Sequence, residues 1–163
     1  MSDTKHTLVA LVEDKPGVLN RVASLFRRRA FNIQSLAVGH SEQPGLSRMT
    51  VVVSGDSAVV EQVRKQLDKL INVIKVTDIT EGDIVARELA LIKVNATAAT
   101  RSEIIQIVDI FRANIVDVAS DSLTVEVTGD EDKVESLFEL LRSFGIKEVT
   151  RTGRVALTRG GTQ

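Results

Sequence analysis

The 163-residue sequence contains no cysteine, no tryptophan and no tyrosine, and it has only two histidines. The missing thiols exclude disulfide bonds and thiolate chemistry, which fits a reducing cytoplasm. The two histidines, His6 and His40, cannot supply a histidine-rich metal cage. Without tyrosine or tryptophan, the chain lacks the rings on which most nucleic-acid sites stack bases. We therefore expect a cytoplasmic protein with no metal site and no nucleic-acid-binding surface.

Charge and hydropathy exclude further classes. The formal net charge is −1, so no overall field attracts nucleic acid or an acidic membrane. No apolar run approaches the roughly 18 residues of a membrane-spanning helix, and the first residues lack the basic and apolar regions of a signal peptide. Hydrophobic residues make up 43% of the sequence. These values are typical of one medium or two small folded domains that do not contact a membrane.

The order of apolar patterns predicts an α+β fold that occurs twice. In the first half we predict strands over 6–13, 32–39, 47–54 and 73–79, a helix over 18–28, and a second helix capped by Asp56 or Ser57. In the second half we predict strands over 87–94, 114–119, 122–127 and 146–152, with helices over 100–111 and 131–144. We therefore expect two tandem ferredoxin-like βαββαβ domains, residues 1–80 and 81–163, each an antiparallel sheet with helices on one face.

Two pairs of landmarks support an internal repeat. Val53-Ser54-Gly55-Asp56 corresponds to Val127-Thr128-Gly129-Asp130, and in both a strand ends where a helix cap begins. Phe26-Arg27 with Asn32-Ile33 corresponds in the same way to Phe111-Arg112 with Asn114-Ile115. The segment Arg159-Gly160-Gly161, beyond the last predicted strand, is expected to be a disordered tail.

The most informative segment is the turn Asp14-Lys15-Pro16-Gly17, which lies between the first strand and the first helix. A helix that begins directly after such a turn presents free N–H groups and the positive end of its dipole, and so favours a carboxylate. The N–H groups of Val18 and Leu19 would hold that carboxylate, while Asp14 or Asn32 would meet an amino group. The alternative is that Pro16-Gly17 is only a tight turn and Asn32 only a turn residue that opens a strand.

No catalytic constellation accompanies this turn. The sequence has no Ser-His-Asp spacing and no glycine-rich phosphate loop. A small phosphatase with this topology uses an arginine in the first loop, but Arg21 falls within the predicted helix. An RNA-recognition module would need aromatic residues on the strand 47–54, which has none. The turn therefore indicates a protein that senses a small molecule rather than one that transforms it.

Several motifs together resemble one family, the regulatory (small) subunits of acetolactate synthase, also called acetohydroxyacid synthase. The first half is similar to an ACT domain in the stretch from Val12 to Val22, and Phe31-Asn32-Ile33-Gln34-Ser35-Leu36 is similar to the family's second strand. More specific to this subunit are Leu46-Ser47-Arg48-Met49-Thr50 and the later stretches Arg87-Glu88-Leu89-Ala90-Leu91-Ile92-Lys93-Val94 and Ile110-Phe111-Arg112-Ala113. The resemblance covers almost the whole chain.

The resemblance implies a non-catalytic subunit that binds and activates a thiamine-diphosphate-dependent catalytic large subunit. It also implies feedback inhibition by valine or another branched-chain amino acid. Thiamine diphosphate, Mg and FAD are expected only in the catalytic partner, and no cofactor is expected in this chain.

In the family the effector lies between the two ACT domains of a homodimer. Transferred to this sequence, Asp14, Gly17, Val18 and Leu19 of one chain would meet Asn32 and Ile33 of the other. Many members have Asn where this chain has Asp14, and an ionised Asp can meet only the ammonium end of an amino acid. The alternative function is a free-standing ACT-type sensor that acts on another enzyme or on a transcription regulator. Such a sensor has no need of the family's second-half motifs.

Overall fold

The computed structural model describes residues 4–29 and 31–160. The chain divides into two compact units, one formed by Met1–Val85 with Arg154–Gln163 and the other by Ala86–Gly153. Residues 154–160 therefore belong with the first unit, whereas the sequence-based boundaries place them in the C-terminal domain.

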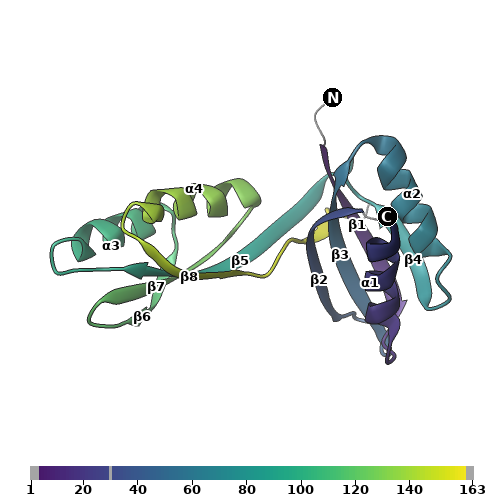
Figure 1. Ribbon diagram of the computed structural model, residues 1–163, viewed down its shortest axis with the longest axis horizontal. Helices are drawn as coiled ribbons and strands as arrows, with labels where there is room; N and C mark the ends of the chain where they lie inside the picture. Colours follow the sequence, from purple (N-terminus) through teal and green to yellow (C-terminus); the bar gives the residue numbers. More distant parts are fainter. Residues whose placement is uncertain (1–3, 30, 161–163) are drawn as a thin grey trace. The chain divides into compact units, whose positions relative to one another are not determined.

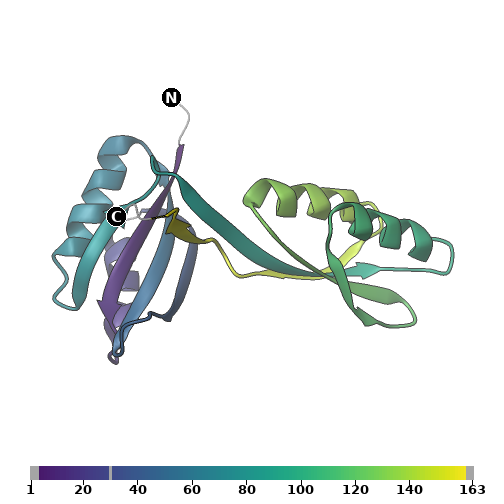
Figure 2. The same ribbon diagram turned by 180° about the vertical axis from the view of Figure 1, so that it is seen from behind.

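Both units have the predicted βαββαβ order, which confirms the fold class. The first unit contains β1 (Thr4–Glu13), α1 (Val18–Arg29), β2 (Asn32–His40), β3 (Leu46–Gly55), α2 (Ser57–Asp68) and β4 (Val73–Asp78). The second contains β5 (Ile84–Asn95), α3 (Arg101–Ile110), β6 (Asn114–Val118), β7 (Ser122–Gly129), α4 (Glu131–Arg142) and β8 (Ile146–Arg151). The antiparallel strand orders are β2-β3-β1-β4 and β6-β7-β5-β8. In each unit both helices lie on one face of the sheet (Figures 1 and 2).

The repeat extends to the irregularities of the strand pairing. Each sheet has two register shifts, one between its first and last strands and one at its edge strand. Their positions correspond in the two units: Leu11/Val12 and Ile33/Ser35 in the first, Lys93/Val94 and Ile115/Asp117 in the second. Because a shift of this kind bends and twists a strand, the two sheets share their local shape as well as their topology.

The repeated Gly-Asp pair has a clear structural basis. Asp56 and Asp130 have extended backbones, and the carboxylate of each accepts a hydrogen bond from the backbone N–H three residues later, at 2.9 Å. The preceding glycines lie under the first turn of the helix. A Cβ on Gly55 would lie 3.1 Å from Val59, and one on Gly129 would lie 2.5 Å from Lys133. The cap is therefore Asp56 rather than Ser57, and a side chain at either glycine would have to displace Val59 or Lys133.

The cores follow from the periodicity of the elements. In the first unit α1 buries Val18, Val22, Leu25 and Phe26 against alternate residues of β1 and β3. In the second unit Ile104 and Val108 of α3, with Leu137 of α4, are buried against alternate residues of β5 and β7. Each sheet thus buries its helix-covered face, as the 3.6- and 2-residue periods require.

A short strand near the C-terminus, β9 (Val155–Thr158), was not predicted. It pairs with β5, and its Ala156 is buried. Arg159 donates its backbone N–H to the carbonyl of Asp83 at 2.8 Å, and its guanidinium lies 3.1 Å from the Asp83 carboxylate. The prediction of a disordered tail is therefore wrong at Arg159 and Gly160, while Gly161 lies outside the described residues.

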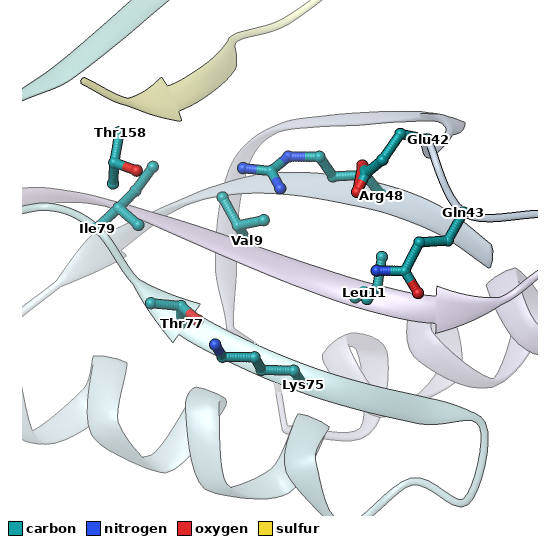
Figure 3. Close-up of a pocket in the computed structure, with 9 residues that line it drawn as sticks. All are labelled: Val9, Leu11, Glu42, Gln43, Arg48, Lys75, Thr77, Ile79 and Thr158. Carbon is teal, nitrogen blue, oxygen red and sulfur yellow. The ribbon is translucent and has the colours of Figure 1, made fainter. Parts of the chain in front are cut away.

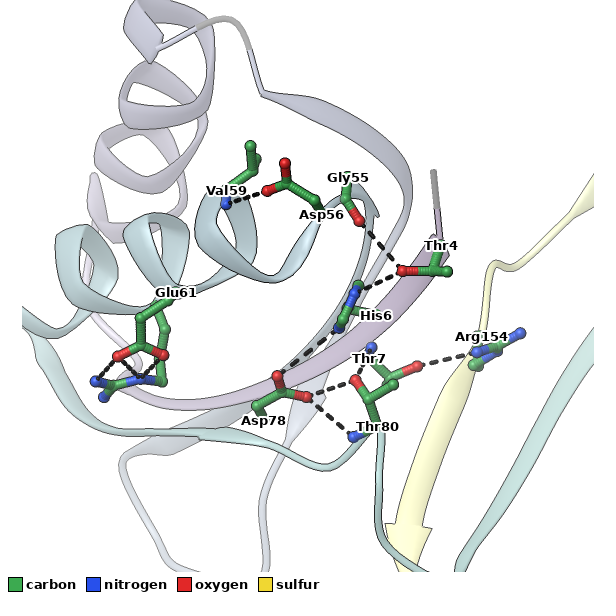
Figure 4. A network of polar contacts seen from close by, with 11 residues as sticks. Thr4, His6, Thr7, Gly55, Asp56, Val59, Glu61, Asp78, Thr80 and Arg154 are labelled. Atoms are coloured by element: carbon green, nitrogen blue, oxygen red, sulfur yellow. Dashed lines mark hydrogen bonds and ion pairs between the residues drawn. The ribbon is translucent and has the colours of Figure 1, made fainter. Parts of the chain in front are cut away.

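Polar contacts attach this C-terminal segment to the first sheet (Figure 4). Arg154 donates to the hydroxyl of Thr7 at 2.9 Å, and the backbone N–H of Thr7 donates to the hydroxyl of Thr80 at 2.9 Å. The Thr80 backbone N–H donates in turn to the carboxylate of Asp78 at 3.0 Å. The bond from Arg154 to Thr7 joins the segment to the first sheet, while the other two connect β1 to the residues that follow β4.

Candidate functional site

The turn between β1 and α1 leaves helix amides exposed at one end of the first sheet. Gly17 has φ +85°, a left-handed conformation that favours glycine. The N–H of Val18 donates to the carbonyl of Lys15 at 3.3 Å, and the N–H of Arg21 donates to Gly17 at 3.0 Å. Among the described residues, the N–H groups of Leu19 and Asn20 have no acceptor outside the helix. The groups available to an anion are therefore those of Leu19 and Asn20.

This differs in detail from the sequence-based hypothesis, which chose the amides of Val18 and Leu19. The Val18 side chain is buried in the core, whereas that of Leu19 is half exposed. Asn20 was missed, although the free amides of any helix extend through its first turn. The sequence predicted that amides are exposed after this turn, but not that the turn itself already uses the N–H of Val18.

Electrostatics distinguish this helix start from others in the chain. The first turn of α1 carries no acidic residue, whereas α3 carries Glu103 there and α4 carries Glu131 and Asp132. The first turn of α2 also lacks one, but the carboxylate of its N-cap Asp56 accepts the N–H of Val59. Acidic side chains at a helix N-terminus complement the positive end of the dipole. At α1 no side chain in the first turn does so, and an external carboxylate can take that position.

The second unit has a different structure at the corresponding place. There the backbone N–H of Thr97 donates to the hydroxyl of Thr100 at 2.9 Å, and that of Thr100 donates back to the Thr97 hydroxyl at 3.2 Å. The two threonines close this turn on itself. The feature that suggests a ligand therefore belongs to the first unit.

Asp14 contacts the end of the edge strand β2. Its backbone N–H donates to the carbonyl of Gly45 at 2.8 Å, and its carboxylate lies 3.2 Å from Nδ1 of His40. Both side chains remain accessible to solvent, with 84% of the His40 side chain exposed. No pattern in the sequence indicates this pair, because the contact depends on how β2 pairs with β3.

Contacts of Asn72 and of Lys15 also position the turn, and the sequence did not predict them. Asn72 accepts the backbone N–H of Glu13 at 2.8 Å through its carbonyl, and its side-chain oxygen accepts a bond from the guanidinium of Arg21. The ammonium of Lys15 lies 2.6 Å from the Glu13 carboxylate, and this hydrogen bond lowers the pKa of Glu13. Lys15 is thus paired with Glu13 rather than with Asp14.

Asn32 and Ile33 lie at the opposite end of the same sheet. Asn32 begins β2 and pairs with Ser54, which pairs in turn with Lys5 of β1. Glu13, next to Asp14, is eight residues further along β1, or about 26 Å at the usual rise of a strand. Asn32 is exposed and Ile33 is partly buried against the core. Within one chain, the structure does not bring these residues to the β1–α1 turn.

Among residues 4–29 and 31–160, no group of three or more His, Asp or Glu side chains lies close enough together to hold a metal ion. In the same part of the chain, no helix is long and apolar enough to cross a membrane.

Two family models match the sequence, and they divide it as the repeat does. One, described as the AHAS small subunit-like ACT domain, matches residues 8–75. The other, described as the small subunit of acetolactate synthase, matches residues 87–160.

Curated relatives and solved structures agree with these matches. The chain is 62% identical over 156 residues to a probable acetolactate synthase small subunit of Archaeoglobus fulgidus, covering 96% of this chain and 98% of that protein. It is 57% identical over 155 residues to the acetolactate synthase small subunit of Mycolicibacterium smegmatis, covering 95% and 91%. The crystal structure of the acetolactate synthase small subunit of Thermotoga maritima superposes with a TM-score of 0.89 at 45% identity, covering 98% of this chain and 99% of that one.

Proposed function

Because this chain belongs to the family of acetolactate synthase small subunits, as a non-catalytic subunit, we propose that it regulates a catalytic large subunit. In this proposal it raises the activity of a thiamine-diphosphate-dependent partner and confers feedback inhibition by valine or another branched-chain amino acid. Thiamine diphosphate, Mg and FAD belong to the partner, and the complex works in the cytoplasm. The family match over residues 87–160 argues against a free-standing sensor, which would not need that half.

The observation that carries the proposal is the unneutralised start of α1. The amides of Leu19 and Asn20 have no acceptor in the described part of the chain, and no acidic side chain lies in the first turn. An amino-acid carboxylate can accept hydrogen bonds from both amides, and it also interacts favourably with the positive end of the helix dipole. Asp14, beside them, suits the ammonium group of the same molecule.

A homodimer would complete this site. β2 is an edge strand, and its Val38 is about half exposed. An unpaired edge can pair with a second copy about a two-fold axis. If the axis passes through Leu36, the midpoint of β2, then His40 of one chain lies opposite Asn32 of the partner subunit. The β1–α1 turn, which contacts His40 through Asp14, then meets the partner's Asn32 and the partner's Ile33.

Inhibition follows from where the ligand lies. An amino acid held between two chains stabilises the paired arrangement in which both halves of the site are in place. The catalytic subunit responds if it binds that arrangement less well, or is less active with it. A coupling free energy of roughly 1–3 kcal/mol is sufficient for useful feedback.

The test is reconstitution with the large subunit from the same source. Condensation of pyruvate is measured with the large subunit alone, with this chain added, and with this chain plus valine, leucine or isoleucine. We expect addition of the chain to raise the rate and one of the three amino acids to lower it again. Calorimetric titration of the chain with the same amino acids checks that the effector binds here.

The outcomes separate the two parts of the proposal. A rate that does not change when the chain is added contradicts the regulatory role. An increase in rate without heat or inhibition from any branched-chain amino acid contradicts the effector site alone.

A further inference from the structure

The face of the first sheet away from α1 and α2 contains a second site. A cavity of about 480 Å³ lies there, roofed at one side by β9 (Figure 3). We call it the sheet-face cavity. It is lined by strand residues Val9, Leu11, Arg48, Lys75, Thr77 and Ile79, by Glu42 and Gln43 of the β2–β3 loop, and by Thr158 of β9. None of the residues assigned above to the effector site lines it.

The strand register places two cations on either side of an apolar floor. Leu11 of β1 pairs with Lys75 of β4 and with Arg48 of β3, so the three side chains form one row across the sheet. Neighbouring strands are about 4.8 Å apart, which separates the two outer Cα atoms by about 10 Å. Across that distance, the side chains of lysine and arginine are long enough for both to contact one ligand group that lies between them. In Figure 3 the charged ends of Arg48 and Lys75 both extend along the cavity toward Val9 and Thr77, so one anionic group can lie between them.

The two cations differ in how firmly they are held. Arg48 donates to the carbonyl of Ala156 in β9 at 3.3 Å, which orients its guanidinium along the cavity. Lys75 is exposed, and within the described residues it forms no ion pair. One cation is thus preorganised, while the ammonium of the other is available to a ligand.

The rest of the lining favours an aliphatic group. Val9 and Ile79 are buried, although they lie on the face that no helix covers, and Leu11 is partly buried. The hydroxyls of Thr77 and Thr158 flank these apolar residues. Glu42 at the rim opposes a group of high negative charge. The volume lies within the usual range for small-molecule sites.

We propose that the sheet-face cavity binds a small aliphatic carboxylate, with its carboxylate between Lys75 and Arg48 and its hydrocarbon part on Val9, Leu11 and Ile79. The ligand also contacts β9, so binding holds the C-terminal segment against the first sheet. This site is independent of the effector site proposed above.

The experiment uses the full chain and three probes in calorimetric titration. Isovalerate is the test ligand, isovaleramide is its neutral counterpart of the same shape, and inorganic phosphate is an anion without a hydrocarbon part. We expect isovalerate to bind and the other two to bind at least tenfold more weakly. Isovaleramide lacks the negative charge, and phosphate lacks the hydrocarbon part. Equal binding of isovaleramide or of phosphate overturns the assigned ligand class, and no binding of isovalerate overturns the site.

Variants place the binding in this cavity. Lys75→Met keeps most of the unbranched side chain but removes its charge, and it should weaken isovalerate binding about tenfold. Lys65→Met is the matched control, since Lys65 is an exposed lysine of α2 and does not line the cavity. The Gly17→Asp variant, altered in the effector turn, should bind isovalerate as the wild type does. Weaker binding in Gly17→Asp, or unchanged binding in Lys75→Met, contradicts the assignment.

Hydrogen exchange gives a readout that does not depend on a variant. Isovalerate should slow exchange of the β9 amides over 155–158, and the neutral amide should not. If isovalerate releases heat on binding but leaves hydrogen exchange in β9 unchanged, the ligand binds elsewhere. That result overturns the proposal.

Discussion

The carboxylate of Asp14 lies 3.2 Å from Nδ1 of His40, and this contact joins the β1–α1 turn to the end of the edge strand β2. The turn carries the free helix amides, and β2 is the strand through which we propose that two chains pair. A ligand at the turn is therefore directly connected to the proposed dimer interface through one pair of side chains.

We expect Asp14→Asn to weaken effector binding. The substitution replaces the carboxylate proposed to meet the effector's ammonium group with a neutral amide, and an ion pair at this exposed site is worth about 1 kcal/mol or less. The valine concentration for half-inhibition should therefore rise up to about fivefold. His40→Gln is the control, because it keeps the Asp14 carboxylate and should change that concentration less. Stronger inhibition in Asp14→Asn would show that repulsion between Asp14 and the ligand carboxylate outweighs the ammonium contact.

We expect Gly17→Asp to abolish inhibition while activation of the catalytic subunit is retained. The new carboxylate lies beside the free amides of α1 and competes for them. Since φ at Gly17 is +85°, any side chain there is strained. Gly17→Asn is the matched control, with the same shape and the same strain but no charge. The valine concentration for half-inhibition should rise at least tenfold more in Gly17→Asp than in Gly17→Asn. Equal effects would assign the loss to backbone strain.

Much of the fold could be predicted because it is locally specified. Alternation along β1 and β3, the apolar stripe of α1 and the Gly-Asp caps all act within a few residues. β9 could not be predicted in the same way. It has four residues, and its partners, β5 and the Asp83 carbonyl, are some seventy positions earlier in the sequence. A short strand defined by distant partners leaves no periodic signal.

The candidate site also combines features specified by local sequence with contacts between residues that are distant in the sequence. The turn at Gly17 and the free amides after it are local, and the sequence indicated them. The contact of Asp14 with His40 and the two bonds to Asn72 cross the fold, and no pattern reveals them. The separation of Asn32 from Asp14 by most of the length of β1 follows only from the strand register. Because of that separation, one chain alone cannot bring Asn32 to the β1–α1 turn, and a site that contains both needs a second chain.

The two helix caps should contribute equally to their own units. Asp56→Ala and Asp130→Ala each remove an acceptor for a backbone N–H at 2.9 Å. Each should lower the free energy of unfolding by about 1 kcal/mol. Asp56→Asn and Asp130→Asn are the controls, because Asn caps nearly as well. Chemical denaturation of the full chain measures the differences, and an Asn variant as unstable as its Ala counterpart would show that the charge matters more than the cap.

Two exposed lysines should each control the pKa of one carboxyl group. The hydrogen bond from Lys15 lowers the pKa of Glu13, and that from Lys147 lowers the pKa of Asp121. Because each pKa is lower in the folded chain, its contribution to stability is present above the unfolded pKa and is lost as pH falls through the folded one. Lys15→Met should raise the pKa of Glu13 and leave Asp121 unchanged, and Lys147→Met should do the reverse. Carboxyl NMR titration measures both, and a change at the other carboxyl group would contradict this independence.

A site shared between two chains predicts complementation between defective variants. Gly17→Asp damages the turn, and Asn32→Ala damages the other half, so each variant alone should be insensitive to valine. In a mixed dimer, the intact turn of one chain faces the intact Asn32 of the partner subunit. Refolding equal amounts of the two variants together should restore about a quarter of the sites if the chains pair at random. Calorimetric titration with valine measures the number of restored sites. Mixed dimers shown by mass spectrometry to form without any recovered site would contradict a shared effector site.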